Sequence, residues 1–201
     1  MKPLKVRQPK QKRALEKKDK IIQVAFQLIC EKGYNETNTT EIANKAGVST
    51  GTLYNYFPDK RAIYLEVYAL YYNQIALPVR EKLKNIKPPF KTKEFIEFIL
   101  DSTTEHHSVS KHVHDEMMML VNTEEDFGLL HRRLAFKMVC EVVSFCEANG
   151  LQVKNMLEKF HIFNHILDLY AHEIVYYKTE GLNYCNIRDT LVSCMLYMMM
   201  E

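Results

Sequence analysis

The chain has 201 residues, 47% of them hydrophobic and 26% charged, with six Gly and six Pro, a composition that excludes collagen-like, low-complexity and disordered proteins. Its five cysteines are odd in number and include no CxxC pair, which argues against a disulfide framework or a zinc knuckle. The charge is uneven, since residues 1–20 carry nine Lys and Arg against two acidic residues, whereas residues 21–201 carry 18 basic and 23 acidic side chains.

The basic N-terminal arm, residues 1–16, is the first predicted segment. Its charge favours a polyanionic partner, nucleic acid or an anionic membrane surface, although a solvated tail fits the charge equally well. The arm contains no apolar stretch of the kind that a secretion signal requires, and the longest uncharged apolar run, residues 194–200, is too short to span a membrane. We therefore expect a cytoplasmic protein without a transmembrane helix.

The first predicted helix covers residues 17–32, where apolar residues recur with helical spacing and Gly33 follows as a C-cap. A short second helix is expected over residues 39–46. Asn38 should cap the backbone N–H of Glu41, while the Glu41 side chain reaches back to the cap.

A third helix is expected after a tight turn, because Gly47 can adopt the positive φ that ends the second helix. Ser49 should cap this third helix, which runs to Phe57. Two short helices separated by a few residues are the signature of a helix-turn-helix. The apolar residues that should set the angle between these helices are Ile42, Ala43, Ala46, Val48, Leu53 and Phe57.

The rest of the chain is predicted to be helical as well. After Pro58 and Asp59 a fourth helix is expected over residues 60–83, and a break follows at residues 87–89. Further helices are expected over residues 92–106, 111–121, 124–148, 153–178 and 186–200. The expected fold is all-α, with a basic arm (1–16), a helix-turn-helix domain (17–65) and a helical regulatory and dimerisation domain (66–201).

Residues 33–67 read GYNETNTTEIANKAGVSTGTLYNYFPDKRAIYLEV and resemble the DNA-binding region of the TetR family of transcriptional regulators. The matching positions are Thr39-Thr40, Ile42-Ala43, Ala46-Gly47-Val48-Ser49, Thr50-Gly51-Thr52, Leu53-Tyr54, Tyr56-Phe57 and Lys60. Two positions depart from the family pattern: Asn38 replaces the usual Ser or Thr cap, and Thr40 stands where a basic residue is common. The resemblance implies double-stranded DNA as the partner, with a roughly palindromic operator.

Ten residues are candidates for DNA contact: Asn38, Thr40, Ser49, Thr50, Gly51, Thr52, Tyr54, Asn55, Tyr56 and Lys60. The small residues 49–52 leave room for the third helix to enter a major groove. Gly51 is costly inside a helix, and close approach to DNA is a reason to keep it, although an idiosyncratic turn residue is the alternative.

Roles follow from the chemistry of these side chains. Tyr54 and Tyr56 should splay toward opposite phosphate walls of the groove, and Lys60 should place its charge at a positive helix N-terminus. Thr50 and Asn55 are the candidate base readers, because Asn can pair bidentately with adenine and the Thr methyl can touch thymine.

The resemblance also implies an effector cavity and a dimer interface in the C-terminal helices. The candidate pocket residues are Tyr72, Phe98, Met117, Phe136, Cys140 and His165. Their character favours a small hydrophobic or aromatic effector, since no basic cluster is present there to neutralise phosphate. An ordinary helical core is the alternative at each position. A repressor released from DNA by its effector is expected, with an activator or a chromosome-organising protein left open.

A polar stripe recurs with helical spacing on the helix expected over residues 153–178, and consists of His161, Asn164, His165, Asp168 and His172. It fits a solvated face, a pocket lining, a dimer seam or a metal site in a metal-dependent helical-bundle enzyme. A second His-rich patch holds His106, His107, His112, His114, Asp115 and Glu116. Without HExxH, GxSxG or a Gly-rich phosphate loop, neither an enzyme nor a cofactor is expected.

A homodimer is expected through the last two helices, 153–178 and 186–200. The last helix holds more apolar residues than one core-facing stripe needs: Ile187, Leu191, Val192, Met195, Leu196, Met198 and Met199. A second copy would be the simplest cover for the excess. The fourth helix, which runs from Lys60 to Tyr71 and Tyr72, is the element expected to report effector binding to the DNA-binding helices.

Overall fold

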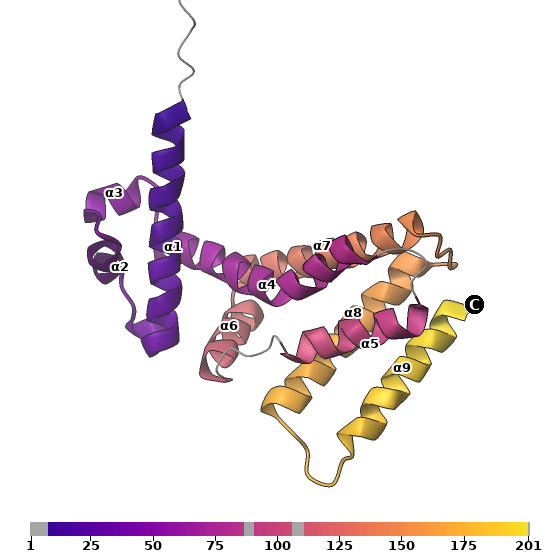
Figure 1. The fold of residues 1–201 in the computed structure, drawn as a ribbon. Helices are drawn as coiled ribbons and strands as arrows, with labels where there is room; N and C mark the ends of the chain where they lie inside the picture. The colour runs from indigo at the N-terminus through magenta and orange to yellow at the C-terminus, as the bar shows by residue number, and fades with distance from the viewer. Residues whose placement is uncertain (1–7, 87–90, 106–110, 201) are drawn as a thin grey trace, which may run out of the picture. The chain divides into compact units, whose positions relative to one another are not determined.

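The computed structural model describes residues 8–86, 91–105 and 111–200, and it describes their side chains apart from those of residues 8–11 and 105. Within these ranges every regular element is an α-helix, which confirms the predicted fold class (Figure 1). The helices are α1 (Gln8–Glu36), α2 (Thr39–Ala46), α3 (Thr50–Tyr54), α4 (Lys60–Asn85), α5 (Thr92–Glu105), α6 (Lys111–Thr123), α7 (Glu125–Ala148), α8 (Met156–Tyr176) and α9 (Tyr184–Met200). Across the part of the chain that is described, none of these helices combines the length and apolarity needed to cross a membrane.

Several predicted helix ends were wrong by three residues or more, among them the start of α8, which lies at Met156 rather than at residue 153. Helix α1 begins at Gln8 rather than at residue 17, because the charged and unbranched residues before 17 favour helix without forming an apolar stripe. Helix α3 ends at Tyr54 rather than at Phe57. The N–H groups of Tyr56 and Phe57 both donate to the Leu53 carbonyl, at 2.9 and 3.1 Å, in a tight turn after the helix.

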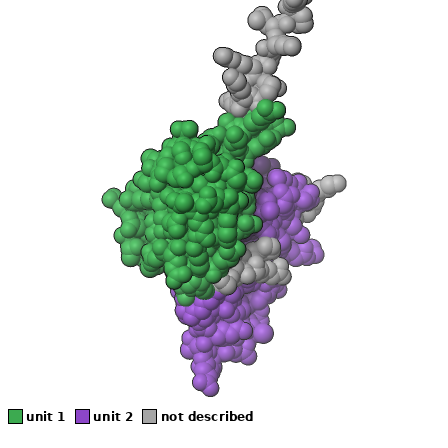
Figure 2. Space-filling model, turned by 90° about the vertical axis from the view of Figure 1, so that its left-hand side faces the viewer, with its two compact units in different colours: residues 1–70, 112–127 green, residues 71–111, 128–201 purple. Residues whose placement is uncertain are grey.

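The described chain forms two compact units, coloured separately in Figure 2. Unit 1 comprises residues 1–70 and 112–127, and unit 2 comprises residues 71–111 and 128–201. Helices α4 and α7 each begin in unit 1 and end in unit 2. The sequence predicts one boundary, at residue 65, whereas the compact units place α6 with the N-terminal helices.

Unit 1 is built around α1, which packs beside α2. Its fully buried side chains come from several helices and include Ile21, Leu28, Ile42, Leu53, Ile63 and Met117. Helix α6 is tied to this unit by polar contacts as well. The Glu116 carboxylate of α6 accepts a hydrogen bond from the Tyr34 N–H. Just after α6, Arg61 of α4 pairs with Glu124 at 3.1 Å and with Asp126, in the first turn of α7, at 3.2 Å.

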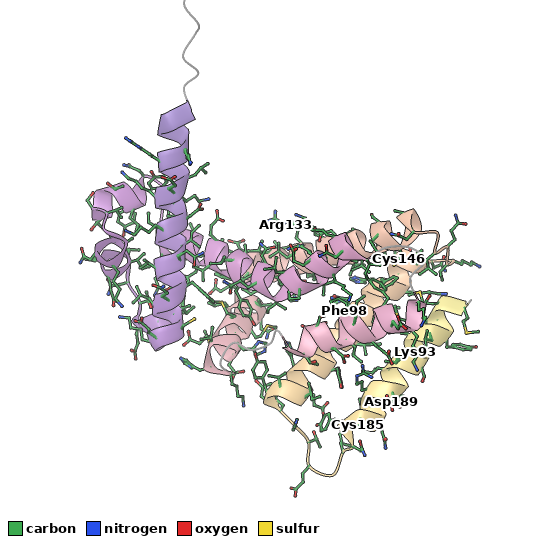
Figure 3. All side chains as sticks on the ribbon, viewed as in Figure 1. Lys93, Phe98, Arg133, Cys146, Cys185 and Asp189 are labelled. Atoms are coloured by element: carbon green, nitrogen blue, oxygen red, sulfur yellow. The ribbon has the colours of Figure 1, made fainter. Side chains whose placement is uncertain are left out.

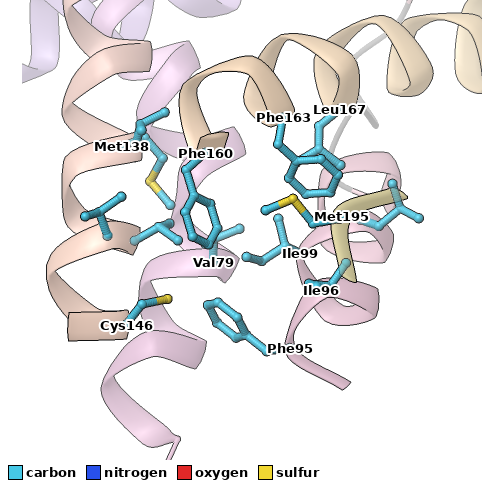
Figure 4. Close-up of a cluster of buried hydrophobic side chains, with 14 of the residues drawn as sticks. Val79, Phe95, Ile96, Ile99, Met138, Cys146, Phe160, Phe163, Leu167 and Met195 are labelled. Atoms are coloured by element: carbon cyan, nitrogen blue, oxygen red, sulfur yellow. The ribbon is translucent and has the colours of Figure 1, made fainter. Parts of the chain in front are cut away.

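Unit 2 has its own apolar core, contributed by α4, α5, α7, α8 and α9 (Figure 4). Phe95 and Ile99 of α5 face Phe160 and Phe163 of α8 in this core. Met195 of α9 reaches the same core and is 0% exposed. A bidentate ion pair between Arg188 and Asp101, with both N–O distances at 2.8 Å, also joins α9 to α5.

The apolar excess of the last helix is therefore used inside the chain. Val192, Met195 and Met199 are buried in the core of unit 2, and Ile187, Leu191 and Leu196 pack partly buried against it. Because α9 packs against both α5 and α8, much of this excess is covered within one chain, and the excess alone does not require a second copy. Large exposed apolar side chains remain on both helices, since Ile162 and Leu169 of α8 are 54% and 68% exposed and Tyr197 and Met200 of α9 are 66% and 85% exposed.

Candidate nucleic-acid interface

Helix α2 begins with the predicted side-chain cap. Asn38 has an extended backbone, and its Oδ1 accepts a hydrogen bond from the Glu41 N–H at 2.9 Å. The second half of the predicted capping box is absent, because the Glu41 carboxylate pairs with Lys32 of α1 instead of returning to Asn38. A charged partner on a neighbouring helix offers a stronger hydrogen bond than the cap's backbone N–H, so the side chain turns toward α1.

The turn between α2 and α3 also follows the sequence. Gly47 has φ of 71° in the left-handed region, and its N–H donates to the carbonyls of Ala43 and Asn44. Ser49 Oγ accepts a hydrogen bond from the Thr52 N–H at 3.1 Å, which caps α3. These local bonds end one helix and start the next within a few residues, so they position α3 against α2.

The surface of α3 is small, polar and exposed at its N-terminal end. Ser49, Gly51 and Asn55 are exposed, and Thr50 and Thr52 are half-buried. A Cβ built on Gly51 would meet no atom closer than Ser49 Oγ at 4.0 Å. Gly51 has no internal packing reason to lack a side chain, so this position is free to lie close to an external partner.

The two tyrosines of the motif differ in their surroundings. Tyr54 is exposed, and its hydroxyl lies 3.1 Å from Thr39 Oγ1, so it links the end of α3 to the start of α2. Tyr56 lies half-buried in the turn that follows α3. Thr40, the other candidate at the start of α2, is exposed. The structure thus brings the candidates from Asn38 to Tyr56 onto two adjoining short helices of unit 1.

Lys60, at the first position of α4, lies in a less open setting than the sequence suggested. Its ammonium is 4.2 Å from the centre of the Tyr34 ring and 5.8 Å from that of Tyr64. Burial lowers the pKa of Lys60, and the negative charge of Glu116 opposes that shift. The ammonium is therefore already engaged by aromatic faces of its own unit.

Gly33, predicted as the C-cap of the first helix, adopts a positive φ at a kink inside α1, but the sequence did not indicate the contact that fills this kink. Gly33 has φ of 85° and ψ of 170°, a region that only glycine adopts readily. The Glu116 carboxylate fills the space where a Gly33 Cβ would stand, and it accepts the hydrogen bond from the adjacent Tyr34 N–H. No local signal pairs Glu116 with this kink, because the two lie far apart in the sequence.

The basic arm is only partly described. Lys2, Lys5 and Arg7 lie outside the described residues, whereas Lys12, Arg13, Lys17 and Lys20 are exposed along α1. Lys18 is used internally, since its ammonium lies 2.5 Å from Glu66 and faces the Phe57 ring. The exposed cations of α1 belong to the same unit as α2 and α3.

The candidate effector residues do not all fall in one unit. Met117 is fully buried in unit 1, whereas Tyr72, Phe98, Phe136, Cys140 and His165 belong to unit 2. Phe98 (labelled in Figure 3) packs partly buried against the unit 2 core, with the Lys82 ammonium 4.9 Å from its ring. Phe136 and His165 are both exposed, and Cys140 is half-buried.

His131 of α7, which the sequence analysis did not single out, interacts with the polar stripe of α8. His131 of α7 lies 6.1 Å from the Tyr72 ring, and its charge interacts with Asp168, His165 and His172. Burial is the largest effect on His131 and lowers its pKa. His172 Nε2 lies 3.5 Å from Asp168 Oδ1.

A metal site within one chain finds no support among the residues described. No group of three or more His, Cys, Asp or Glu side chains is arranged there to hold an ion. In the second His-rich patch, His106 and His107 lie outside the described residues, and His114 is buried. His112 lies on the surface beside Glu116, at 3.8 Å.

Comparison with known proteins agrees with the geometry of α2 and α3. The family described as "Bacterial regulatory proteins, tetR family" matches residues 21–67. The HTH-type transcriptional regulator YuxN of Bacillus subtilis (strain 168) is 33% identical over 92 residues, which are 45% of this chain and 32% of YuxN. CymR of Pseudomonas putida is 31% identical over 99 residues, 49% of this chain and 47% of CymR. The chain thus matches less than half the length of either relative.

The similarity of fold extends further than the similarity of sequence. A crystal structure from Mesorhizobium loti MAFF303099, described as a TetR-family transcriptional regulator, superimposes with a TM-score of 0.72 at 19% identity. The superposition covers 92% of this chain and 97% of that one. At this identity the likeness concerns the fold, so both units have the helical architecture found in that structure.

Proposed function

We propose that this protein, whose residues 21–67 are a DNA-binding region of the TetR family of transcriptional regulators, is a sequence-specific repressor that leaves its operator when a small hydrophobic effector binds. The observation that carries the proposal is the pair of capped short helices, α2 and α3, with the exposed surface of residues 49–55. Such a surface fits a major groove about 12 Å wide. The proposal includes no catalytic activity.

Within this surface we assign two kinds of contact. Thr40 lies exposed in the first turn of α2, where the helix dipole favours a phosphate. Asn55 lies exposed at the end of α3, and its amide can pair with a base edge. Phosphate contacts hold any DNA sequence, whereas base contacts select one.

Replacing these two residues one at a time should show that Thr40 contributes to affinity for any DNA and that Asn55 contributes to the choice of sequence. Thr40→Ala should weaken operator and random DNA alike, by about tenfold at most, and leave the salt dependence almost unchanged, because threonine carries no charge and its loss releases no counterion. Asn55→Ala should relax the preference at one base position, a discrimination of about 1–3 kcal/mol. Footprinting on the DNA upstream of the gene, with binding titrations at several salt concentrations, measures both. Equal losses on specific and random DNA for both variants would refute this assignment.

The proposed effector site lies in unit 2, where Tyr72, Phe98 and Cys140 are half-buried side chains of apolar or aromatic character. A ligand that lowers operator affinity tenfold needs only about 1.4 kcal/mol of preference for the conformation that does not bind DNA. The footprint should therefore be repeated with hydrophobic and aromatic candidate effectors. Loss of the footprint with one of them, and not with sugar phosphates, is the expected result.

TetR-family regulators act as dimers, and we propose that this chain dimerises through α8 and α9. The exposed apolar residues Ile162, Ile166 and Leu169 on α8 supply a surface that a second copy can bury. In a two-fold dimer the two recognition helices enter major-groove faces about 34–36 Å apart, which requires a roughly palindromic operator.

Leu169→Arg should weaken this dimer by about 100-fold, since each copy loses a buried leucine and gains a charge at the contact. The substitution spares the core, because Leu169 is 68% exposed in the chain. Leu77→Arg, at a similarly exposed position on α4, is the matched control and should leave the dimer unchanged. Light scattering over a range of protein concentrations measures the effect. An unaltered dimer in Leu169→Arg would exclude α8 as the interface.

A further inference from the structure

Two histidines stand side by side on the outer surface of α8. His161 and His165 are both exposed, and their ring centres are 4.8 Å apart with the planes at 84°. Residues four apart on a helix lie on the same face, so this pairing is a property of the helix itself. The Phe136 ring of α7 borders His161 at 6.1 Å and covers it from one side.

The separation suits two ligands of one metal ion. Imidazole nitrogens bind Zn²⁺ at about 2.0–2.1 Å, and tetrahedral coordination then places two ring centres roughly 5 Å apart. A small rotation of either ring would bring the observed pair to that value. One chain supplies only these two ligands, because no larger metal-binding group exists among the described residues. The remaining positions of a tetrahedral site must come from elsewhere.

A second copy of the chain is the source that the surface favours. Leu169 and Ile162, the most exposed apolar residues of α8, lie on the same side of the helix as His165. The only basic residue of α8, Lys159, donates to the Met198 carbonyl at 2.6 Å and so is directed toward α9. This face of α8 thus carries apolar, imidazole and carboxylate groups, and α8 adds no Lys or Arg to it that would repel a metal ion.

We propose that His161 and His165 of two copies together bind one divalent transition-metal ion of the zinc class at the dimer interface. In a two-fold dimer, each copy would contribute its own His161 and His165 near the symmetry axis. The two pairs together would then provide four imidazoles around one ion. The proposal rests on the dimer through α8 that is part of the proposed function. Metal binding then stabilises the dimer, because the complete site exists only in the dimer.

Zinc titration of the full-length protein tests this site. After EDTA treatment and dialysis, calorimetry with ZnCl₂ should give one ion per two chains at micromolar affinity, and light scattering at low protein concentration should show zinc shifting monomer to dimer. His161→Gln and His165→Gln should each weaken zinc binding by more than about 100-fold, since even the loss of a residue that only orients a ligand costs about 10–100-fold. His112→Gln, at an exposed histidine of α6, is the control and should bind zinc normally.

The outcomes separate this site from the function on which it rests. Co²⁺ should give the intense visible absorption of tetrahedral coordination in the wild-type protein and in His112→Gln only. One zinc per chain, no zinc binding, or binding unchanged in both Gln variants of α8 would overturn the metal site. If zinc-free protein still dimerises and binds its operator, the proposed function stands without it. A chain that stays monomeric with and without zinc would remove the dimer as well.

Discussion

Gly51→Leu should lower operator affinity by at least about 100-fold while the protein remains fully folded. In the structure a Cβ at this position would meet no atom closer than Ser49 Oγ at 4.0 Å, so a side chain can be attached here without a close contact at its base. Leucine is also the better helix former by close to 1 kcal/mol. On DNA, however, the side chain would occupy the space into which the α3 backbone approaches the groove. Gel-shift titration measures the affinity, and thermal unfolding followed by circular dichroism shows that the fold is kept.

Two controls make this result specific to the DNA surface. Gly51→Ala should cost much less than Gly51→Leu, because a single methyl group displaces the backbone from DNA only slightly. Ser144→Leu adds the same side chain at an exposed position of α7 in unit 2, and should leave operator binding unchanged. Operator affinity within a few fold of the wild type in Gly51→Leu would place the recognition surface elsewhere.

Gly33→Ala should destabilise unit 1 by about 3–5 kcal/mol, a large part of the stability of an ordinary domain. A residue with a Cβ is strained at this φ and ψ, at a cost of about 1–3 kcal/mol. The Cβ also displaces the Glu116 carboxylate from the Tyr34 N–H, and losing a hydrogen bond to a charged group costs about 1.5–3 kcal/mol. Urea unfolding, with hydrogen exchange at the kink around Gly33, measures the loss.

Gly150→Ala is a control for the positive φ alone. Gly150 has nearly the same φ of 84°, but a Cβ there would meet no atom within 4 Å, so only the backbone strain of about 1–2 kcal/mol is expected. Glu116→Gln keeps the shape of the side chain and removes the charge, and it should fall between the wild type and Gly33→Ala. If Gly33→Ala costs no more than Gly150→Ala, the Glu116 contact contributes nothing to stability.

The local signals of the DNA-binding helices could be predicted from the sequence. Asn38, Gly47 and Ser49 act within a few residues of their own position, so the caps and the turn follow from residue type and spacing alone. The full length of α1 could not be predicted in this way, because its first residues favour helix without an apolar stripe.

Contacts between distant segments were beyond the reach of the sequence. Nothing near Tyr34 indicates that Glu116 of α6 will bind its N–H. The apolar excess of α9 suggested a partner chain. The spacing of apolar residues along a helix shows that they need a cover, but it does not show which neighbouring helix supplies it. Which side of α8 remains exposed was likewise decided by the packing of α5, α8 and α9 together.

Because α6 belongs to unit 1, this unit, here called the head, cannot be cut out of the chain or moved into another protein as one continuous segment. Residues 71–111 form a long excursion between the two segments of this unit, so the unit is discontinuous along the chain. A fragment that stops at Leu70 keeps every residue of the recognition helices but loses Glu116, Glu124 and Asp126, the carboxylates that hold Tyr34 and Arg61. During synthesis the head is therefore complete only after α6 and the start of α7 have left the ribosome. A chimaeric regulator that borrows this head needs α6 as well as the residues that touch DNA.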